Sequence, residues 1–344
     1  MTRRPRARRA RLPRSRGGPS RPAPARLVIA GAALVVLVLA LGAWRYLGPG
    51  PGRAVDVVLP AGAGLAGIGR DLAGAGVVRS RAGFMVAAVL SGAAHRLKAG
   101  EYGFRAGESL ADVVAAIARG EVVRHVVTIP EGLTSRDAVA ILLRADYLAG
   151  RSAIPPEGSL LPETYEVRRG ESRSSVIQRM AAARNRLLDQ LWAARAPGLP
   201  FASKEQAVIL ASVVEKETAI AAERPKVAAV FINRLKKGMR LESDPTVIYG
   251  VASGAPLGHG LRVSELAARN PYNTYLVAGL PPTPIDNPGR ASLAATLSPA
   301  PTADLYFVAD GTGGHAFADT FEAHRRNVAR WRAIEQARHV GPAA

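Results

Sequence analysis

Residues 203–250 read SKEQAVILASVVEKETAIAAERPKVAAVFINRLKKGMRLESDPTVIYG. Ser203 and Gln206 have the spacing of a capping box, which predicts that a helix begins at this point. Pro225 suits the first turn of a second helix, and Gly238 suits the position just after its last turn. The stretch therefore predicts two successive helices, the second over 226–237, followed by a loop over 240–246.

One glutamate in this stretch shares a helical face with hydrophobic residues. At about 100° per residue, Leu210, Val213 and Val214 lie within about 60° of Glu217, whereas Glu215 lies about 160° away from it. A carboxylate in apolar surroundings is disfavoured as the anion, so its pKa rises. Such a group can act as a general acid near neutral pH. The alternative is that Glu217 lies at the edge of the buried face with its carboxylate in water.

The composition excludes several classes of site. The chain of 344 residues contains no cysteine, so neither a disulfide framework nor a thiolate metal site can form. The six histidines are scattered, and His315 and His324 are nine residues apart. Because no His-x-x-x-His pair is present, the sequence predicts no zinc site.

The N-terminal segment combines a basic tail with an apolar run. Residues 1–26 contain ten arginines and no acidic residue, and their Pro/Arg/Ser/Gly composition predicts a disordered tail. Residues 27–47, LVIAGAALVVLVLALGAWRYL, are long enough to span a membrane, with Trp44 and Tyr46 as interfacial anchors. The charge asymmetry predicts a cytoplasmic tail and an extracytoplasmic remainder. A cleaved signal peptide is the alternative interpretation.

The net charge of +19 raises the possibility of nucleic-acid binding, but its distribution argues against it. The excess is concentrated in the tail, which has no aromatic residue on which a base could stack. The sequence therefore predicts no nucleic-acid partner. A Pro/Gly linker is predicted over 48–53, between the membrane span and the folded part.

A strand–turn–helix pattern recurs three times between residues 54 and 150. The strands are predicted at AVDVVL (54–59), EYGF (101–104) and VVTI (126–129). Glycine stands at each following turn, where a positive φ is favourable. Short strands joined to amphipathic helices predict a small α+β domain.

Polar and aromatic residues gather in the second half of the chain. Residues 157–167 (EGSLLPETYEV) place a carboxylate, a hydroxyl and a phenol after a proline, which suits a polar ligand such as a sugar or an ordinary strand entry. Residues 271–275 (PYNTY) precede the proline-rich loop GLPPTPIDNPG (279–289), a combination typical of groove walls. A hairpin over 304–317 and a helix over 321–338 are predicted to follow.

LASVVEKETA, PYNTY, GLPPTPIDNPG and LYFVADGTGGHAF, with the order tail, span, small domain and large domain, resemble the endolytic murein transglycosylase (YceG-like) family. The resemblance implies an α+β fold with a LysM-like module over 54–150 and a catalytic domain with a central catalytic helix over 151–344. It implies cleavage of MurNAc–GlcNAc bonds within peptidoglycan glycan strands, leaving 1,6-anhydro-MurNAc ends and terminating glycan elongation. No cofactor is expected.

The resemblance assigns the catalytic acid to Glu217, which is followed by the hydroxyl residue Thr218. It suggests that the sugar is contacted by six side chains: Glu163, Tyr165, Asp244, Tyr249, Asn273 and Tyr275. The implied partners are glycan strands, the cytoplasmic membrane and, as candidates, peptidoglycan synthases, at a single-pass site in the inner membrane. Two alternatives stay open: a hydrolytic muramidase with Asp244 or Glu163 as second carboxylate, and a non-catalytic peptidoglycan-binding scaffold.

Overall fold

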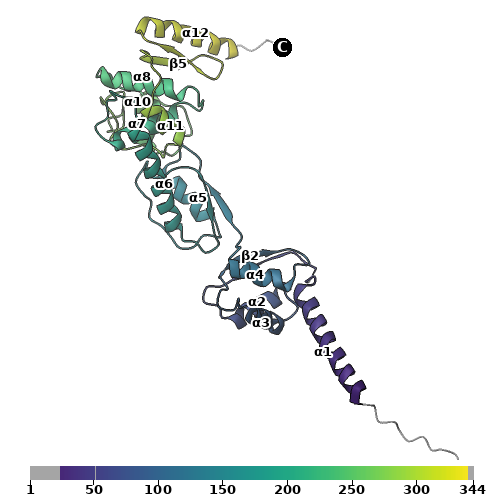
Figure 1. The fold of residues 1–344 in the computed structure, drawn as a ribbon. Coiled ribbons are helices and arrows are strands. Elements are labelled where there is room, and N and C mark those ends of the chain that lie inside the picture. The colour runs from purple at the N-terminus through teal and green to yellow at the C-terminus, as the bar shows by residue number, and fades with distance from the viewer. Residues whose placement is uncertain (1–23, 51, 340–344) are drawn as a thin grey trace, which may run out of the picture. The chain divides into compact units, whose positions relative to one another are not determined.

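The computed structural model describes residues 24–50 and 52–339, so most of the predicted basic tail lies outside the described residues. The chain divides into two compact units, Met1–Val122 and Val123–Ala344. The first unit contains α1 (Pro24–Leu47), β1 (Val55–Leu59), α2 (Leu65–Gly74), α3 (Arg81–Leu90), β2 (Gly100–Phe104) and α4 (Leu110–Arg119). Figure 1 shows these elements in chain order.

Two antiparallel strands, β1 and β2, pair in the first unit and place Val57 opposite Tyr102. Their inner side chains pack with α2, α3 and α4 around Leu72, Phe84 and Ile117, all fully buried. The strands and the helices α2 and α4 confirm the first two predicted repeats. Helix α3 was not predicted, although Ser80 caps it by accepting a hydrogen bond from the amide of Gly83.

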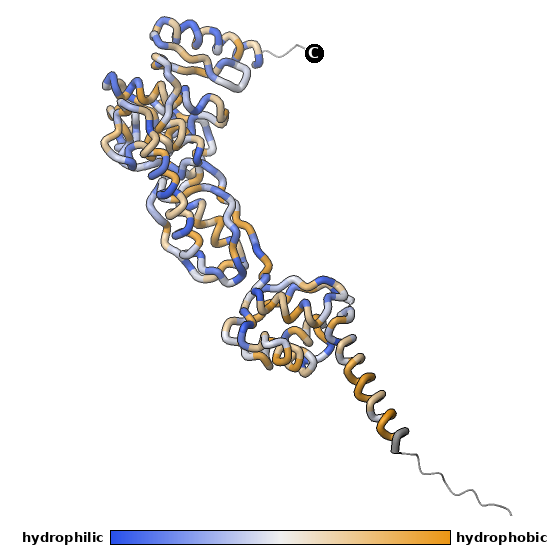
Figure 2. Tube along the Cα trace, viewed as in Figure 1, coloured by the Kyte–Doolittle hydropathy of each residue, from blue (hydrophilic) through white to orange (hydrophobic). Residues whose placement is uncertain are grey.

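Helix α1 is mostly apolar between Leu27 and Trp44, and the hydropathy colouring in Figure 2 shows hydrophobic residues along it. In the described part of the chain, Leu27–Leu47 is the one helix long and apolar enough to cross a membrane. Its side chains are almost all exposed, unlike those of a core helix. Exposed apolar residues over about 31 Å of helix are compatible with a single-pass membrane anchor.

The second unit is a mixture of helices and short strands. It contains β3 (His125–Thr128), α5 (Ser135–Arg144), β4 (Thr164–Val167), α6 (Arg173–Ala193), α7 (Lys204–Glu217), α8 (Arg224–Lys236), α9 (Asp244–Ala252), α10 (Val263–Leu266), α11 (Arg290–Leu297), β5 (Tyr306–Ala309), β6 (His315–Ala318) and α12 (Phe321–His339). Strands β5 and β6 form the predicted hairpin, with Phe307 opposite Phe317. The α+β class is thus confirmed.

The third predicted strand–turn–helix copy belongs to the second unit. Strand β3 pairs antiparallel with β4, which places Val127 opposite Tyr165. Helices α5 and α6 pack against this strand pair in a core around Leu142, Leu160 and Met180. As a result, residue 150, the expected boundary between module and catalytic domain, lies inside the second unit, and the compact division follows Val122.

Helix α7 lies at the centre of the second unit. Its residues Leu210, Val213 and Val214 pack with α8, and its residues Ala207 and Ala211 pack with α6 and α11 in a separate cluster. Every residue from 207 to 214 is buried, so the helix is covered on all sides. The predicted start is confirmed, because the Ser203 side chain accepts a hydrogen bond from the Gln206 amide.

Candidate active site

Glu217 is the last residue of α7, and the chain leaves the helix at Thr218 in an extended conformation. Its Oε2 accepts a hydrogen bond from the hydroxyl of Ser243 at 3.0 Å. Burial raises the pKa of Glu217 to about 7, with the Ser243 hydrogen bond lowering it and the neighbouring charge of Asp244 raising it. A carboxyl group with this pKa is partly protonated at neutral pH, as a general acid requires.

Ser243 reaches Glu217 because it is diverted from its usual role. It is the residue before α9 and has the position of an N-cap, yet its side chain makes no capping hydrogen bond. Its own amide donates to the Thr274 hydroxyl at 3.0 Å, and that hydroxyl is 2.8 Å from the Thr246 hydroxyl. Ser243, Thr246 and Thr274 are all buried. The hydroxyl that would normally cap a helix is therefore held against a carboxyl group instead.

The residue before Ser243 has an unusual backbone. Glu242 has a φ of 52°, in the left-handed region that side chains rarely adopt. It is held there by contacts on both sides: its amide donates to the Thr274 carbonyl, and its carboxylate pairs with Arg234 at 3.1 Å. Arg234 also donates to the carbonyl of Leu241 at 2.9 Å. Backbone strain of this kind persists where the surroundings fix it, and it is common at functional sites.

Asp244 and Tyr275 lie next to this pair. The Tyr275 hydroxyl donates a hydrogen bond to Oδ1 of Asp244 at 2.7 Å. Burial and the charges of Asp244, Glu217 and Glu242 raise the pKa of Tyr275. The structure thus brings two of the six predicted sugar-contacting residues close to Glu217.

Glu215 is also buried, contrary to what its place opposite Glu217 on the helix suggested. Its side chain is only 4% exposed and pairs with Arg224 at 2.9 Å, while its second oxygen accepts from the Gly289 amide. The helical faces do not separate the two glutamates, because both lie at the end of α7, where neither face is fully covered or fully exposed. Their partners do: Glu215 is neutralised by a cation, whereas Glu217 has a hydroxyl donor.

The other predicted contact residues lie elsewhere or are committed to the fold. The Asn273 side chain is fully buried and bonds to the carbonyls of Leu266 and Ala268 and to the Tyr275 amide. The Tyr165 hydroxyl donates to the Leu161 carbonyl within the core beside β4. The polar groups of both side chains are hydrogen-bonded to backbone atoms.

Glu163 and Tyr249 have polar groups nearer to solvent. Glu163 is 41% exposed and pairs with Arg290 at 3.0 Å. Tyr249 packs against Tyr272 with ring centroids 4.9 Å apart. Burial raises the pKa of Tyr249 to about 12, so its phenol stays protonated. The hydrogen bonds and ion pairs of the described residues do not link Glu163 or Tyr249 to Glu217.

Sequence reasoning missed Ser243, Thr274 and Arg234. The signal that could have found Ser243 is Ser-Asp-Pro, in which the serine has an N-cap position before a proline of the first helical turn. No local pattern indicates that its hydroxyl turns to Glu217, 26 residues earlier. Among the described residues, no group of three His, Asp or Glu side chains is placed to hold a metal ion.

Comparison with known proteins gives consistent matches. A family model described as the YceG-like family matches residues 57–330. A curated protein of Streptococcus pneumoniae named endolytic murein transglycosylase is 30% identical over 325 residues, covering 80% of this chain and 58% of the relative. A protein of the same name from Bacillus subtilis is 36% identical over 175 residues, covering 50% of this chain and 47% of the relative.

A solved structure is similar as well. The crystal structure of a protein described as YceG-like, from Listeria monocytogenes, matches with a TM-score of 0.50 and 26% identity, over 79% of this chain and 98% of that one. The chain spans 58% and 47% of the length of the two curated relatives, so it shares a large part of them and not their whole length.

Proposed function

The chain belongs to the YceG-like family, and from this membership and the site geometry we propose that it is an endolytic murein transglycosylase. The proposed reaction cleaves MurNAc–GlcNAc bonds within peptidoglycan glycan strands and leaves 1,6-anhydro-MurNAc ends. The observation that supports it most is the carboxyl group of Glu217, which is partly buried, accepts a hydrogen bond from Ser243 and has a pKa of about 7.

In the proposed mechanism, protonated Glu217 donates its proton to the glycosidic oxygen as the anomeric carbon becomes oxocarbenium-like. The resulting carboxylate accepts the proton of the C6 hydroxyl of the same MurNAc, whose oxygen bonds to the anomeric carbon. Glu217 ends the cycle protonated, and no water is consumed. The Ser243 hydroxyl, 3.0 Å from Oε2, stabilises the anionic intermediate state of the glutamate.

The residues around Glu217 are proposed either to contact the sugar or to hold the contacting residues in place. Asp244 and Tyr275 are proposed to contact the sugar, because their hydrogen-bonded pair adjoins Glu217. Asn273 is proposed to position Tyr275 through its bond to the Tyr275 amide. Glu163 and Tyr249 are proposed as contacts for sugar residues further along the strand, and Tyr165 as a support of β4.

The first unit supports a membrane-bound arrangement. Helix α1 is proposed as a single inner-membrane span, with the tail in the cytoplasm and the residues after α1 on the extracytoplasmic side. The LysM-like module predicted over 54–150 is proposed to include the β1, α2, α3 and β2 elements of the first unit. Peptidoglycan synthases are proposed as protein partners, because the proposed activity terminates the glycan strands that they elongate.

A hydrolytic muramidase is the second candidate, and one observation favours it. The charge of Asp244 raises the pKa of Glu217, so a second carboxylate lies close to the acid. Hydrolytic glycosidases use such a pair, one as acid and one as base or nucleophile. The products differ in mass, because an anhydro end is lighter than a reducing end by one water.

The test is digestion of purified sacculi by the full-length protein in detergent, with mass analysis of the released ends. Wild type is expected to release anhydro ends, and Glu217→Gln to release none. Glu205→Gln is the matched control, since Glu205 lies on the same helix with its side chain 68% exposed. Reducing ends would establish the muramidase, and unchanged cleavage by Glu217→Gln would remove Glu217 from the mechanism. If wild type itself cleaves nothing, the scaffold alternative gains support.

A further inference from the structure

Helix α3 has two apolar faces, of which one is covered. Phe84, Ala87 and Ala88 are buried in the first unit. On the outer side, Val86 is 57% exposed, Val89 59% and Leu90 82%. The sequence RAGFMVAAVL has no charged residue after Arg81. A helix of this length with apolar residues all round is unusual at a water-exposed surface.

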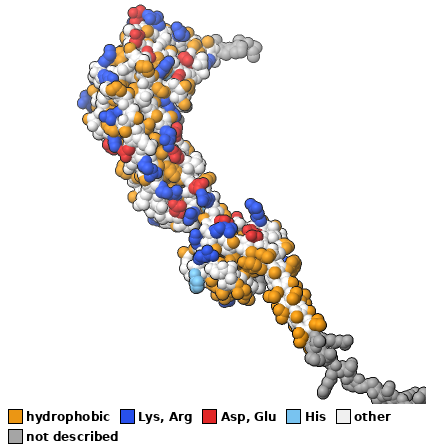
Figure 3. Space-filling model, viewed as in Figure 1, with side chains coloured by type: hydrophobic (Ala, Val, Ile, Leu, Met, Phe, Trp, Pro, Cys, Tyr) orange, Lys and Arg blue, Asp and Glu red, His pale blue; other side chains and the backbone are white. Residues whose placement is uncertain are grey.

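This outer face borders a groove that it shares with α1. The groove has a volume of about 730 Å³ and is lined by Val38 and Gly42 of α1 and by Val86 and Leu90 of α3. Figure 3 shows hydrophobic side chains along α1 and on the adjoining surface of the first unit. The apolar surface of the span therefore continues onto the folded module.

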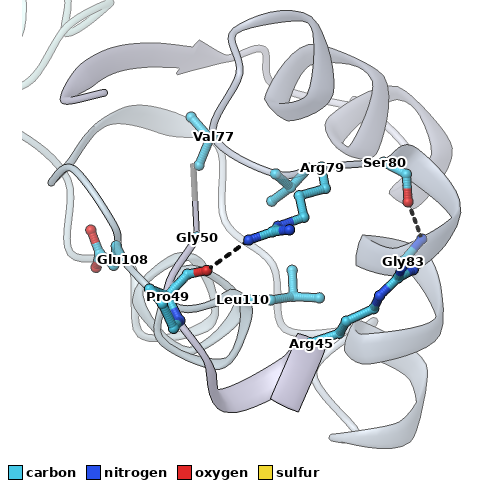
Figure 4. A pocket seen from close by; sticks show the side chains of 10 residues that line it. Arg45, Pro49, Gly50, Val77, Arg79, Ser80, Gly83, Glu108 and Leu110 are labelled. Atoms are coloured by element: carbon cyan, nitrogen blue, oxygen red, sulfur yellow. Dashed lines mark hydrogen bonds between the residues drawn. The ribbon is translucent and has the colours of Figure 1, made fainter. Parts of the chain in front are cut away.

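The end of α1 is fastened to the module. Arg79 donates a hydrogen bond to the Pro49 carbonyl at 3.1 Å, and its guanidinium lies 5.6 Å from the centroid of the Trp44 ring. The Gly50 amide donates to the Gly107 carbonyl at 3.1 Å. Figure 4 shows Arg79 reaching Pro49 across a smaller pocket. The segment predicted as a linker is thus partly bound to the module.

The depth of α3 follows from this attachment. Val38 and Leu47 are nine residues apart, which is about 13 Å along a helix at 1.5 Å per residue. If Leu27–Leu47 fills a hydrocarbon core of about 30 Å, this last stretch lies in one leaflet. Because α3 lines the same groove as Val38, its outer face lies at the depth of that leaflet.

The polar groups around the groove suit a lipid headgroup region. Arg45 lines the groove, and Arg79 and Arg81 flank the start of α3. The smaller pocket beside it also contains one acidic side chain, Glu108. Arginines that keep their guanidinium groups at the surface above apolar residues are typical of helices lying in a membrane interface.

We propose that the outer face of α3 is inserted in the membrane leaflet next to the module, with acyl chains of anionic phospholipids filling the groove between α1 and α3. The module is then held against the membrane by two elements, a spanning helix and an interfacial helix. An interfacial helix buries its apolar face about 5–10 Å into the headgroup and acyl boundary, which suits side chains of the size of Val86 and Leu90. This inference depends on α1 spanning the membrane and does not depend on the glycan-cleaving activity.

The test uses the absence of cysteine from the chain, which allows single labels. Full-length Val86→Cys and Leu90→Cys proteins, labelled with an environment-sensitive fluorophore, are reconstituted in phosphatidylglycerol and phosphatidylethanolamine vesicles that contain doxyl-labelled lipid. Val58→Cys is the matched control, because Val58 is 50% exposed in the same unit and does not line the groove. We expect quenching at positions 86 and 90 to exceed that at 58 at least threefold.

Equal quenching at all three positions overturns the proposal. Labels at 86 and 90 that are shielded from both lipid quencher and aqueous iodide also overturn it, because a protein, such as a second copy of the chain, then covers α3. Replacing phosphatidylglycerol by phosphatidylcholine is expected to weaken quenching at 86 and 90, and an unchanged signal overturns the preference for anionic lipid. The Glu217→Gln background should give the same quenching, which separates this inference from the proposed activity.

Discussion

The Ser243 hydroxyl and Oε2 of Glu217 are 3.0 Å apart, joining the start of α9 to the end of α7. Two residues earlier on the same helix, Glu215 pairs with Arg224 at 2.9 Å. One carboxylate thus has a neutral donor and the other a cation, although both lie at the same end of α7. This difference in partners, more than a difference in burial, is why Glu217 is the proposed proton donor.

The rate of glycan cleavage is expected to fall above pH 7. The mechanism requires protonated Glu217, whose pKa is about 7, so each further pH unit should lower the rate about tenfold. Initial rates of fragment release from sacculi between pH 5 and 9 measure this decline, which is the alkaline limb of the pH–rate profile. Glu205→Gln should reproduce it, and a rate that is still rising at pH 9 would contradict the assignment.

Two neighbouring substitutions are expected to move this limb in opposite directions. Ser243→Ala removes a hydrogen bond that lowers the pKa of Glu217, so the limb should shift to higher pH. Asp244→Asn removes a charge that raises the pKa of Glu217, so the limb should shift to lower pH while the Tyr275 hydroxyl keeps an acceptor. The pH profiles of both variants measure the shifts. Displacement in the same direction by both would show that the limb reports another group.

Glu217→Gln is expected to change the pH dependence of stability. The folded-state pKa of about 7 lies above the ordinary value of 4.5 for a glutamate, so folding favours the protonated form. The stability associated with this proton is fully present below about pH 4.5 and is lost as the pH rises through 7. At about 1.4 kcal/mol per pKa unit, the wild type should lose about 2–3 kcal/mol over this range.

Glutamine does not titrate, so the stability of the variant should not fall in this way. Between pH 5 and pH 8 its unfolding free energy should therefore rise by this amount relative to that of the wild type. Denaturant unfolding of both proteins in the same detergent measures the difference. A difference in unfolding free energy that does not change with pH would mean that Glu217 is solvated.

Glu215→Gln is expected to destabilise the fold without moving the pH limb. Truncating one partner of a buried pair costs about 3–5 kcal/mol when the other charge is left uncompensated. The side chains of Glu215 and Arg224 are only 4% and 10% exposed, but Arg224 keeps Glu131 as a second partner at 3.4 Å. The expected cost is therefore smaller, about 1–3 kcal/mol. Thermal unfolding and the pH profile of the folded fraction measure the two effects. A shifted limb with unchanged stability would reverse the roles assigned to the two glutamates.

Local signals in the sequence were sufficient for most elements. Ser203 and Pro225 predicted the starts of α7 and α8, and Gly238 predicted the end of α8, to within two residues, because caps and helix stops act within one turn. Helix α9 was predicted as a loop up to Thr246 and begins at Asp244, where Pro245 occupies the first turn. Helix α3 was overlooked because its outer face is as apolar as its inner face, so it lacks the periodicity that identifies a surface helix.

The site was predictable only in part, since its geometry depends on contacts between distant segments. Glu217 was predicted from its helical face together with the family resemblance, but Ser243 and Thr274 come from two later segments that meet only in the fold. Asn273 looked like a ligand contact because it stands between aromatic residues. Its side-chain amide donates hydrogen bonds to two carbonyls of the preceding segment, and residue type alone cannot reveal this.

Asn273→Ala and Tyr275→Phe are expected to separate positioning from substrate contact. The alanine variant leaves the partly buried carbonyls of Leu266 and Ala268 without this donor, which should cost about 1–3 kcal/mol of unfolding free energy. Tyr275→Phe removes a partly exposed hydroxyl and should change stability by less than about 1.5 kcal/mol.

Glycan binding should respond in the opposite order, with the larger loss in Tyr275→Phe. Folded Asn273→Ala should lose affinity only as far as Tyr275, whose amide it no longer holds, is displaced. Tyr275→Phe should bind glycan fragments more weakly at nearly full stability, if its hydroxyl and Asp244 together face the sugar. Calorimetric binding of a chitooligosaccharide-type fragment to the inactive Glu217→Gln background, with and without each substitution, measures this. If Asn273→Ala is as stable as its parent and loses affinity, then Asn273 contacts the sugar directly, and its role in holding the loop is refuted.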